Sequence, residues 1–574
     1  MKYLKEYLKK YKLEAVVAPL FKMLESCFDL IVPLIVASII DVGIANDDKG
    51  FILTRFGILI FMAVLGLVCS FVAQFFAARA AVGTAAGLRR SLLERIQGFG
   101  FTELDRTDAS TLITRMTSDV NQVQNGINMF LRLFLRSPFI VFGAAILAFT
   151  INSKVALIFI AVIVVLFVIV FGIMLITAPL YKDVQKNLDN VTAVTRESLN
   201  GVRVIRAFGR EEAQNKKFVK INSALLKAQL YVGKIAALMS PLNYIVINSA
   251  IILILWIGSK TVSGGVMLSG DVIALINYIN QILIELVKLA NLIIILGKSV
   301  SCMGRIEQVL DTETEMKFDG TESGEDSAEI LRFDKVCLKY AGAGAEALSD
   351  ISFSVKRGET IGIIGGTGSG KTSLINMIPR FYDATGGCVY IKGKPINTLS
   401  QSEVRSSVAV VAQKPVMFSG TIKSNLRWGN PIADDEAIWK ALETAQAADF
   451  VKNKPNGLDE RTEQGGRNFS GGQKQRLTIA RALLSETDIL ILDDSASALD
   501  YATDAALRKA LKNLPDDKTV IIVSQRAGSV MQADKILVLE DGRIAGTGKH
   551  EELLESCEVY REIYDSQFKT EERA

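Results

Sequence analysis

The sequence is poor in the residues that build metal and redox sites. Its 574 residues include a single histidine, His550, and six cysteines. No two cysteines lie closer than about thirty residues, so neither CxxC pairs nor zinc-ligand spacings occur. A single histidine also excludes mechanisms that need two, including those of most zinc hydrolases. The cysteines are therefore expected to act as small buried hydrophobic residues in a reduced setting.

The sequence also has almost no excess of charge of either sign, and it has few prolines. The formal net charge is only +4 over the whole chain, which gives no support to nucleic-acid binding, because that function needs a concentrated basic face. With 11 prolines and 49% hydrophobic residues, the chain is neither collagen-like nor disordered. A mean hydropathy of +0.30 is high for soluble domains, so part of the chain is predicted to lie in lipid. The length indicates two or more domains.

Apolar residues are concentrated in the first half, and 13–311 is predicted to be an all-α transmembrane domain. A spanning helix needs about 20 largely apolar residues. The stretches near 81–128 and 180–232 are rich in helix formers, so the spans are expected to continue as helices well beyond the membrane. The six predicted spans are 17–44, 52–80, 129–151, 155–179, 233–259 and 271–297.

The distribution of basic residues orients this domain. Residues 1–12 carry five lysines among regularly spaced tyrosines and leucines, which predicts an amphipathic helix on the inner membrane surface. Arginines follow the second span, whereas the short connections hold few basic residues. The positive-inside rule then predicts a multi-pass protein of the cell (plasma) membrane with both termini cytoplasmic. The acidic residues 312–329 are typical of a solvated linker.

Residues 330–574 are predicted to form an α/β domain that binds a nucleotide. The apolar strand Ile361–Ile364 runs into a loop of the pattern GxxxxGK[ST], followed by a helical segment. In such a loop, backbone N–H groups surround phosphates at the start of a helix. The lysine neutralises the β- and γ-phosphates, and the next hydroxyl holds Mg²⁺. The phosphate-binding residues are Gly365, Gly366, Thr367, Gly368, Ser369, Gly370, Lys371 and Thr372.

Two later segments point to the same chemistry. The apolar strand Ile489–Leu492 ends in Asp493 and Asp494, and a carboxylate at this position can orient Mg²⁺ beside the phosphate loop. The segment NFSGGQKQR precedes a helix and offers a second set of N–H groups to an anion. This set cannot reach the chain's own filled loop, so it suits a nucleotide held by another subunit. Its residues are Ser470, Gly471, Gly472 and Gln473.

These motifs, in this order, resemble those of an ABC transporter half, in which a six-span membrane domain is fused to one P-loop nucleotide-binding domain. The resemblance covers nearly the whole chain. It implies an exporter-type ATPase and translocase that uses ATP and Mg²⁺. It also implies that Tyr340 stacks on adenine, that Gln413 is the Q-loop residue, and that Asp500 belongs to the D-loop.

The resemblance further assigns the metal and the coupling segments. Thr372, Gln413 and Asp493 would hold Mg²⁺. The segments 103–112 and 204–212, which connect membrane helices, would dock near Gln413 and carry movement between the domains.

Two positions depart from the family's catalytic pattern. In this family the strand that ends in Asp493 is called Walker B. The residue after its aspartate is usually glutamate, which positions the attacking water. Here it is Asp494, whose carboxylate is drawn back by about 1.5 Å, too far to align that water well. Gln525 occupies the place of the switch histidine and offers no proton transfer. His550 lies further along the chain and is interpreted as structural. The ATP held by this chain is therefore expected to bind well and turn over slowly.

The segment NFSGGQKQR matches the signature motif of the ABC family and is intact. An intact signature in a chain whose own ATP site is degenerate favours a heterodimer. The chain resembles the degenerate-site subunit of bacterial heterodimeric multidrug exporters, whose competent site would combine Ser470–Gln473 with glutamate and histidine from a second ABC half-transporter subunit. A slow homodimer and a nucleotide-gated channel or regulator remain alternatives. The apolar spans suit hydrophobic or amphipathic cargo, whether drugs, lipids or peptides, without identifying it. No peptidase domain is expected before the spans.

Polar residues within the spans mark a candidate substrate path. Asn277, Gln281 and Glu285 repeat on one face of the sixth span, and Asp29 lies in the first. Because polar groups rarely face lipid, this face is expected to line the bundle interior or a wet cavity. Hydrogen bonds between helices, including a Glu285–Lys288 pair, explain the pattern equally well.

Overall fold

The fold was analysed in a computed structural model of the chain, which describes residues 2–314, 316, 318, 320, 327–515 and 517–568. The chain divides into two compact units. Unit 1 comprises residues 1–97 and 109–312, and unit 2 comprises residues 98–108 and 313–574. Much of the predicted linker, 312–329, lies outside the described residues.

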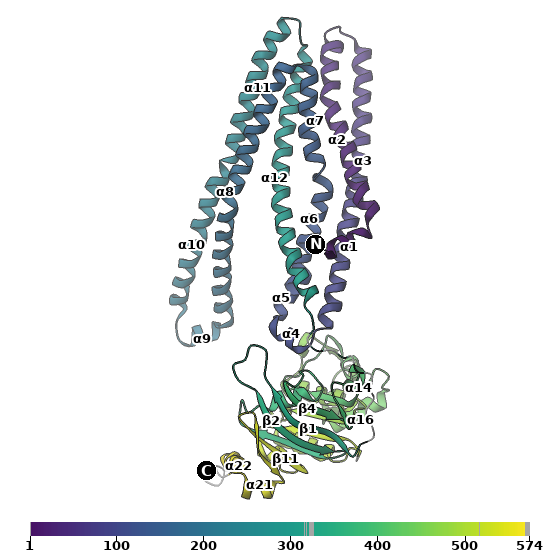
Figure 1. Cartoon of the computed structure of the whole chain (residues 1–574), viewed down its shortest axis with the longest axis vertical. Coiled ribbons are helices and arrows are strands. Elements are labelled where there is room, and N and C mark those ends of the chain that lie inside the picture. Colours follow the sequence, from purple (N-terminus) through teal and green to yellow (C-terminus); the bar gives the residue numbers. More distant parts are fainter. Residues whose placement is uncertain are drawn as a thin grey trace. The chain divides into compact units, whose positions relative to one another are not determined.

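Unit 1 is entirely helical, and its described residues contain six segments long and apolar enough to cross a membrane (Figure 1). This confirms the six-span prediction. The elements are α1 (Lys2–Lys9), α2 (Lys12–Ser38), the π-helix η1 (Ile39–Ile44), α3 (Lys49–Gln97), α5 (Ala109–Thr114), the π-helix η2 (Arg115–Asp119), α6 (Val120–Leu133), α7 (Arg136–Ile151), α8 (Ser153–Asn200), α9 (Val202–Ala207), α10 (Glu211–Ala237), α11 (Met239–Ser263) and α12 (Ser269–Asp311).

The helices extend far beyond the apolar spans, as the sequence predicts. The helix α3 has 49 residues and α8 has 48, so each is about 70 Å long, against a hydrocarbon layer about 30 Å thick. Two predicted spans are broken. One break separates α6 from α7 shortly before Pro138, and the other separates α10 from α11 shortly before Pro241. A proline, which lacks the N–H that a continuous helix requires, follows each break, whereas Pro19, Pro33 and Pro179 lie inside unbroken helices.

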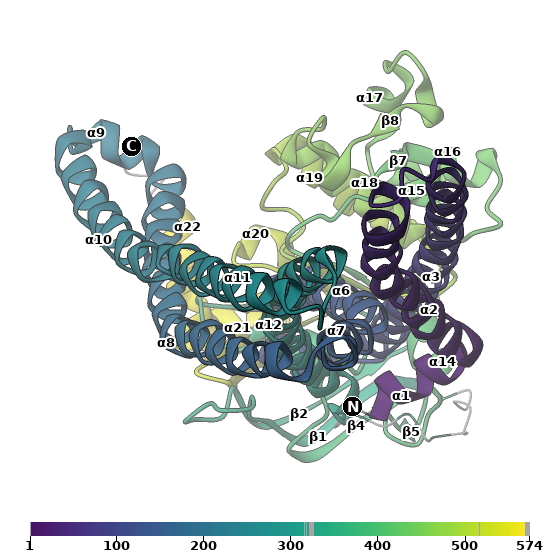
Figure 2. The ribbon, with the colours of Figure 1, turned by 90° about the horizontal axis from the view of Figure 1, so that it is seen from above.

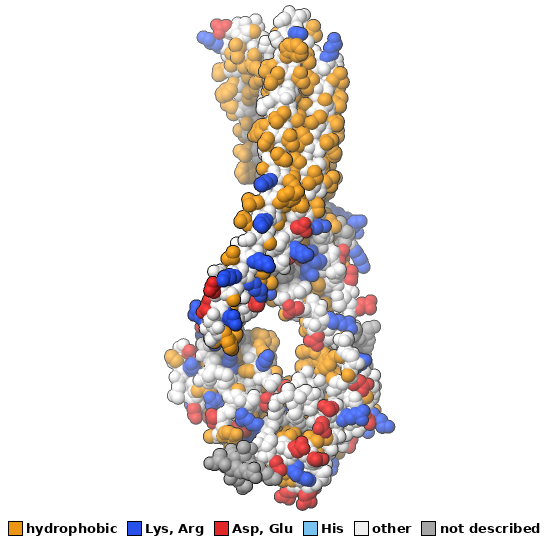
Figure 3. All heavy atoms as spheres, turned by 90° about the vertical axis from the view of Figure 1, so that its left-hand side faces the viewer, with side chains coloured by type: hydrophobic (Ala, Val, Ile, Leu, Met, Phe, Trp, Pro, Cys, Tyr) orange, Lys and Arg blue, Asp and Glu red, His pale blue; other side chains and the backbone are white. Residues whose placement is uncertain are grey.

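Unit 1 has two groups of helices. Seen from above, α8, α10 and α11 lie together, away from α2 and α3 (Figure 2). A shared core that includes Phe159, Ile254 and Tyr278 connects α8, α11 and α12. On the face shown in Figure 3, hydrophobic side chains cover the upper part of unit 1, and Lys and Arg appear further down its helices. This pattern fits helices that leave an apolar layer and enter water.

Unit 2 is built on two sheets. A six-stranded sheet has the order β12-β11-β3-β10-β9-β6, parallel except for β12, and an antiparallel sheet has the order β2-β1-β4-β5. The carboxyl ends of β3, β9 and β10 therefore meet at one edge, where α/β proteins bind ligands. The strands are β1 (Glu329–Leu338), β2 (Leu348–Lys356), β3 (Thr360–Gly365), β4 (Gly386–Ile391), β5 (Lys394–Pro395), β6 (Val408–Val411), β7 (Gly420–Thr421), β8 (Arg461–Thr462), β9 (Ile489–Asp493), β10 (Thr519–Val523), β11 (Lys535–Glu540) and β12 (Arg543–Gly548).

Helices cover the sheets and form a second apolar core. This core joins β6 and β9 to α16 and α18 through residues such as Leu442, Leu477 and Leu490. The helices of unit 2 are α4 (Phe101–Arg106), α13 (Lys371–Met377), α14 (Gln401–Ser407), α15 (Ile422–Leu426), α16 (Asp435–Thr444), α17 (Ala448–Lys452), α18 (Gly471–Leu483), α19 (Tyr501–Leu511), α20 (Ala527–Val530), α21 (His550–Ser556) and α22 (Glu558–Phe568), with 3₁₀ turns η3 (Gly457–Asp459) and η4 (Gln464–Gly466).

Candidate functional site

The predicted phosphate loop connects β3 to α13 and lines a cavity of about 520 Å³. Gly368 and Gly370 have positive φ angles of 86° and 96°, a conformation that residues with a Cβ rarely adopt. A side chain at Gly365 would collide with the carbonyl oxygen of Leu539. The loop therefore needs glycine to take this shape, which turns backbone N–H groups toward the space where phosphates bind.

The side chain of Lys371 is held by hydrogen bonds to the backbone of the phosphate loop. The Nζ of Lys371 donates to the carbonyl oxygens of Gly365, at 2.8 Å, and Gly366, at 2.6 Å. Burial lowers the pKa of Lys371, and the nearby carboxylates of Asp494 and Asp493 oppose that shift. An anion entering the cavity would add negative charge beside the ammonium group and favour its charged form.

Asp493 and Asp494 line the same cavity at the end of β9. Burial, with the charge of Asp494, raises the pKa of Asp493. Asp494 has a left-handed backbone with φ 44°, and its carboxylate accepts a hydrogen bond of 3.2 Å from Nε2 of Gln413. The carboxylate is therefore directed at the Q-loop glutamine.

Gln525 lines the cavity from the segment after β10. The C-terminal helix fixes the backbone of this segment. Gln567 of α22 donates from Nε2 to the carbonyl of Gln525, at 2.8 Å, and accepts from the N–H of Ala527, at 2.9 Å. The sequence analysis missed Gln567, and no local signal identifies it, because its two contacts join residues 40 and 42 positions apart.

Comparisons with known proteins agree with this geometry. The sequence matches the families described as ABC transporter transmembrane region, over residues 16–286, and ABC transporter, over residues 348–497. It is 36% identical to the uncharacterized ABC transporter ATP-binding protein YfiB of Bacillus subtilis, with 98% of each chain covered. The chain belongs to the ABC transporter family.

Two further similarities describe the fold and the range of relatives. This ABC transporter is 29% identical to the ATP-dependent lipid A-core flippase of Hahella chejuensis, over 87% of this chain and 85% of that protein. Its structure is similar to that of a bacterial Atm1-family ABC exporter with ATP bound, with a TM-score of 0.79, 22% identity, and coverage of 97% and 98% of the two chains. The predicted fold class is confirmed: six membrane helices are followed by an α/β nucleotide-binding domain.

Membership in this family establishes the general activity. The transporter is a multi-pass membrane protein whose nucleotide-binding domain binds ATP with Mg²⁺ and acts as an ATPase that drives translocation. The cavity fits this chemistry, because it combines a phosphate loop, a lysine and oxygen donors. Among the described residues, no group of three His, Cys, Asp or Glu side chains is placed to hold a metal ion.

The signature of this ABC transporter lies apart from the cavity. In the described part of the chain, none of the cavity-lining residues comes from the signature. Ser470 caps α18 by accepting from the N–H of Gln473, and Gln473 accepts from the N–H of Ser470. Asp500 caps α19 by accepting two hydrogen bonds from Thr503, which hold the pKa of Asp500 below its usual value. These residues are ordered by local capping, without contact with the chain's own phosphate loop.

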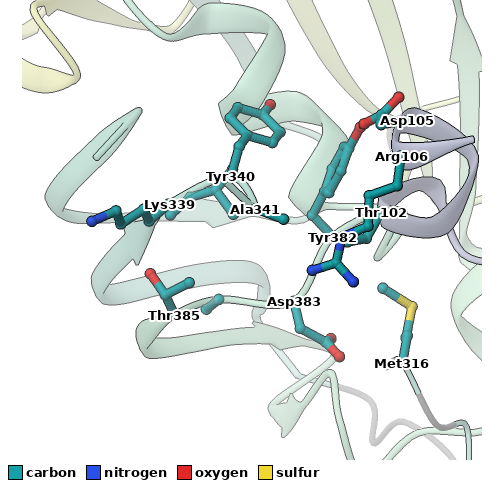
Figure 4. A pocket seen from close by; sticks show the side chains of 12 residues that line it. Thr102, Asp105, Arg106, Met316, Lys339, Tyr340, Ala341, Tyr382, Asp383 and Thr385 are labelled. Carbon is teal, nitrogen blue, oxygen red and sulfur yellow. The ribbon is translucent and has the colours of Figure 1, made fainter. Parts of the chain in front are cut away.

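Tyr340 lines a neighbouring pocket of about 640 Å³ (Figure 4). Its hydroxyl donates to Oγ of Ser373 at 2.9 Å, and its ring packs edge-on against Tyr382 with centroids 5.0 Å apart. Ser373 also lines the phosphate cavity. The predicted adenine-stacking residue thus reaches the phosphate-loop helix through its hydroxyl.

The first part of the predicted docking segment 103–112 contacts an aromatic pair of unit 2, while its contact with the region of Gln413 stays a prediction. The hydroxyl of Tyr382 donates to the carboxylate of Asp105 at 2.6 Å (Figure 4), and Phe101 stacks on Phe381 with centroids 4.3 Å apart. The helix α4, which includes residues 103–106 of the segment, therefore docks beside Tyr382. An aromatic pair directly after α13 offers both a stacking face and a hydroxyl donor, which the sequence analysis overlooked.

The polar residues of the membrane helices form a connected network. Arg136 of α7 donates to Asp29 at 2.9 Å, and Gln281 donates to the backbone oxygen of Asp29 at 3.2 Å. The buried Glu285 accepts from Ser137 at 2.7 Å and from Lys288 at 2.8 Å. Asn277 is exposed and donates to its own helix backbone. The structure thus supports the helix–helix interpretation for Glu285, while the substrate path stays a prediction.

Proposed function

We propose that this chain is one subunit of an exporter for hydrophobic or amphipathic compounds, and that it pairs with a different ABC subunit. Its own ATP site would be degenerate, and its signature would complete the competent site of the partner. Both termini would lie in the cytoplasm, as the distribution of basic residues in the sequence favours.

At the degenerate site, the loop from Gly365 to Thr372 would surround the phosphates with N–H groups. Lys371 would exchange its two carbonyl partners for the β- and γ-phosphates. Thr372, Asp493 and Gln413 supply oxygen donors at one side of the cavity, and such donors suit Mg²⁺. Tyr340 would turn from Ser373 to stack on the adenine base.

The observation that carries the proposal is the environment of Asp494. Its carboxylate is one methylene shorter than the usual glutamate and accepts a hydrogen bond from Gln413. A water attacking the γ-phosphate must be aligned within a fraction of an ångström, and this carboxylate is held by another residue. The neighbouring switch residue, Gln525, cannot transfer a proton. Both changes weaken hydrolysis without weakening ATP binding.

The signature supports the second half of the proposal. Gly471 begins α18, with open space where a Cβ would lie, so a phosphate can approach its N–H group. Because the cavity of the same chain is lined by other residues, the phosphate would come from a second subunit. A chain that had lost all ATPase function would have no reason to retain this exposed anion site.

The cargo is proposed only by class. One relative is named as a lipid A-core flippase, and lipids are amphipathic. The membrane helices are largely apolar, with one ion network that includes Asp29, Arg136 and Glu285. An amphipathic compound would find an apolar surface for its tail and charged groups for its head.

The test compares ATPase rates of the purified chain alone, with the ABC subunit encoded beside it, and with Asp494→Glu plus Gln525→His. We expect slow turnover by the chain alone, robust turnover with the partner, and faster turnover by the restored chain. A matched control, Glu540→Asp on the exposed end of β11, should change nothing. Robust turnover by the unaltered chain alone, unaffected by the two restoring substitutions, would contradict the proposal.

A further inference from the structure

The N-terminal segment of residues 2–12, which begins with the helix α1, packs on α3 through two aromatic side chains. The Tyr7 ring covers Gly87, and a Cβ at that glycine would lie 2.6 Å from it. The Tyr11 ring covers Gly83 one turn earlier, where a Cβ would also collide with it. The hydroxyl of Tyr7 forms a hydrogen bond with Ser91. Because these two glycines have no side chains, the tyrosine rings pack directly on the backbone of α3. This packing fixes the position of α1 on α3.

The same helix reaches the last residue of α12. The hydroxyl of Tyr3 donates to the carboxylate of Asp311 at 2.7 Å. From α3, Arg95 donates to the backbone oxygen of Thr312. These contacts hold the point at which α12 ends and the chain continues toward the nucleotide-binding domain. A shift of α1 on α3 would therefore reach that connection directly.

The lysines of this segment are turned to the outside. The side chains of Lys2, Lys5, Lys9, Lys10 and Lys12 are all exposed. Within the described residues, none of the five is ion-paired. The nearby carboxylate of Glu14 instead faces Arg79 of α3, at 3.5 Å. The outer surface of residues 2–12, the lysine surface of α1, therefore carries concentrated positive charge, with five exposed lysines against one exposed glutamate, Glu6, although the whole chain is almost balanced.

Two neighbouring elements locate this surface at the edge of the apolar layer. Directly after Lys12, exposed apolar residues begin in α2, with Leu13 at 68% and Val16 at 58% exposure. On α3, the closely spaced exposed apolar residues end at Val82, immediately before Gly83, and Leu93 is the one large apolar side chain beyond it that is exposed. The lysines thus lie at the depth of lipid headgroups.

We propose that the lysine surface of α1 binds anionic phospholipid headgroups, and that this contact promotes ATP turnover by holding the end of α12 through Tyr3. The charge suits an anion, and the adjoining apolar residues suit the acyl chains of the same molecule. A soluble phosphate compound would use only the first of these features. Anionic lipids are abundant in the leaflet that faces the cytoplasm.

The binding test uses the full chain in nanodiscs, with photoactivatable phosphatidylglycerol or phosphatidylcholine as probe and cross-links mapped to residues 2–12. We expect preferential labelling by phosphatidylglycerol. Replacing all five lysines by glutamine should reduce that preference by about fivefold or more, since each lysine near an anionic surface contributes about that factor. The matched control replaces five exposed lysines of unit 2 by glutamine and should keep the preference. The control lysines are Lys440, Lys452, Lys509, Lys512 and Lys549.

The coupling test measures ATPase activity in the same nanodiscs, with the partner subunit if the chain alone is slow. Phosphatidylglycerol should raise the activity of the wild type, and the lysine variant should lose that increase. Tyr3→Phe, which removes the hydroxyl bound to Asp311, should keep the labelling and lose the increase.

Each remaining outcome contradicts part of the proposal. Equal labelling by both lipids, or loss of preference in the control variant, overturns the lipid site. A Tyr3→Phe variant that responds like the wild type overturns the coupling. An equal increase from soluble glycerol phosphate overturns the assignment to lipid. The labelling does not depend on which subunits hydrolyse ATP, so its failure is distinguishable from failure of the heterodimer proposal.

Discussion

Gln567 of the C-terminal helix binds the backbone on both sides of Arg526, through the Gln525 carbonyl at 2.8 Å and the Ala527 N–H at 2.9 Å. One side-chain amide thereby helps to fix the backbone that directly follows the switch residue, Gln525. The contact connects the end of the domain with the edge of the sheet where ATP binds.

Removal of this amide should loosen the switch segment. In Gln567→Ala, two hydrogen bonds of about 1 kcal/mol each are lost, so amide hydrogen exchange at residues 525–528 should become on the order of tenfold faster. ATP affinity should change little, because the phosphate loop is untouched. Glu562→Ala, an exposed residue of the same helix, is the control. Unchanged exchange at the switch would show that the rest of α22 suffices.

A methyl group at Gly471, the first residue of α18, should keep or raise the stability of the fold and lower the ATPase activity. Gly471 has no atom near the position of a Cβ, so Gly471→Ala fits the fold and favours the helix by about 1 kcal/mol. The methyl group would obstruct a phosphate that approaches the N–H. We expect an equal or higher melting temperature and a strongly reduced ATPase rate of the assembled transporter. A rate equal to that of the wild type would remove the signature from the partner's site.

The docking of α4 should depend on one hydroxyl. Tyr382 donates to Asp105 at 2.6 Å, and burial with this hydrogen bond raises the pKa of Tyr382, so the group stays a neutral donor at physiological pH. A hydrogen bond to a charged group is worth about 1.5–3 kcal/mol. Tyr382→Phe should therefore raise hydrogen exchange in residues 101–106 by about tenfold or more. Asp105→Asn, which keeps an acceptor, should have a smaller effect, and the reverse order would contradict the prediction.

An ion cluster in unit 2 should make stability depend on pH. Asp488 accepts from Lys392 at 2.8 Å and from Arg357 at 2.9 Å. Burial alone would raise the pKa of Asp488, but these two cations hold it below its usual value. The folded-state pKa is thus lower than the unfolded one, about 3.9. The stabilisation is complete above that value and disappears as the pH falls through the folded pKa.

Asp488→Asn should accordingly lower the free energy of unfolding by about 1–3 kcal/mol at neutral pH, seen as a lower melting temperature of the full chain. The difference from the wild type should shrink below about pH 4. Glu486→Gln, which changes a nearby charge outside this cluster, is the control. A difference that stays constant at acidic pH would contradict the linkage.

Local patterns predicted much of this molecule. The phosphate loop, the Walker B strand and the six apolar helices each lie within a short stretch of sequence, so their composition and spacing identify them. Proline alone does not predict the helix breaks, because it also lies inside unbroken helices. The packing of Tyr11 on Gly83 and the hydrogen bond from Tyr382 to Asp105 could not be predicted from local patterns, because they join residues 72 and 277 positions apart.

The hairpin of α8 and α10 carries apolar residues at its far end, around α9, where Leu199, Val204 and Phe208 are 70%, 61% and 76% exposed. About twenty largely polar residues separate this tip from the apolar part of α8, so the tip lies in water, some 30 Å along the helix. An unassembled subunit would present it to chaperones and proteases. The cellular amount of this protein would then depend on how quickly each new copy finds the surface that covers its tip, because copies that stay unassembled would be degraded.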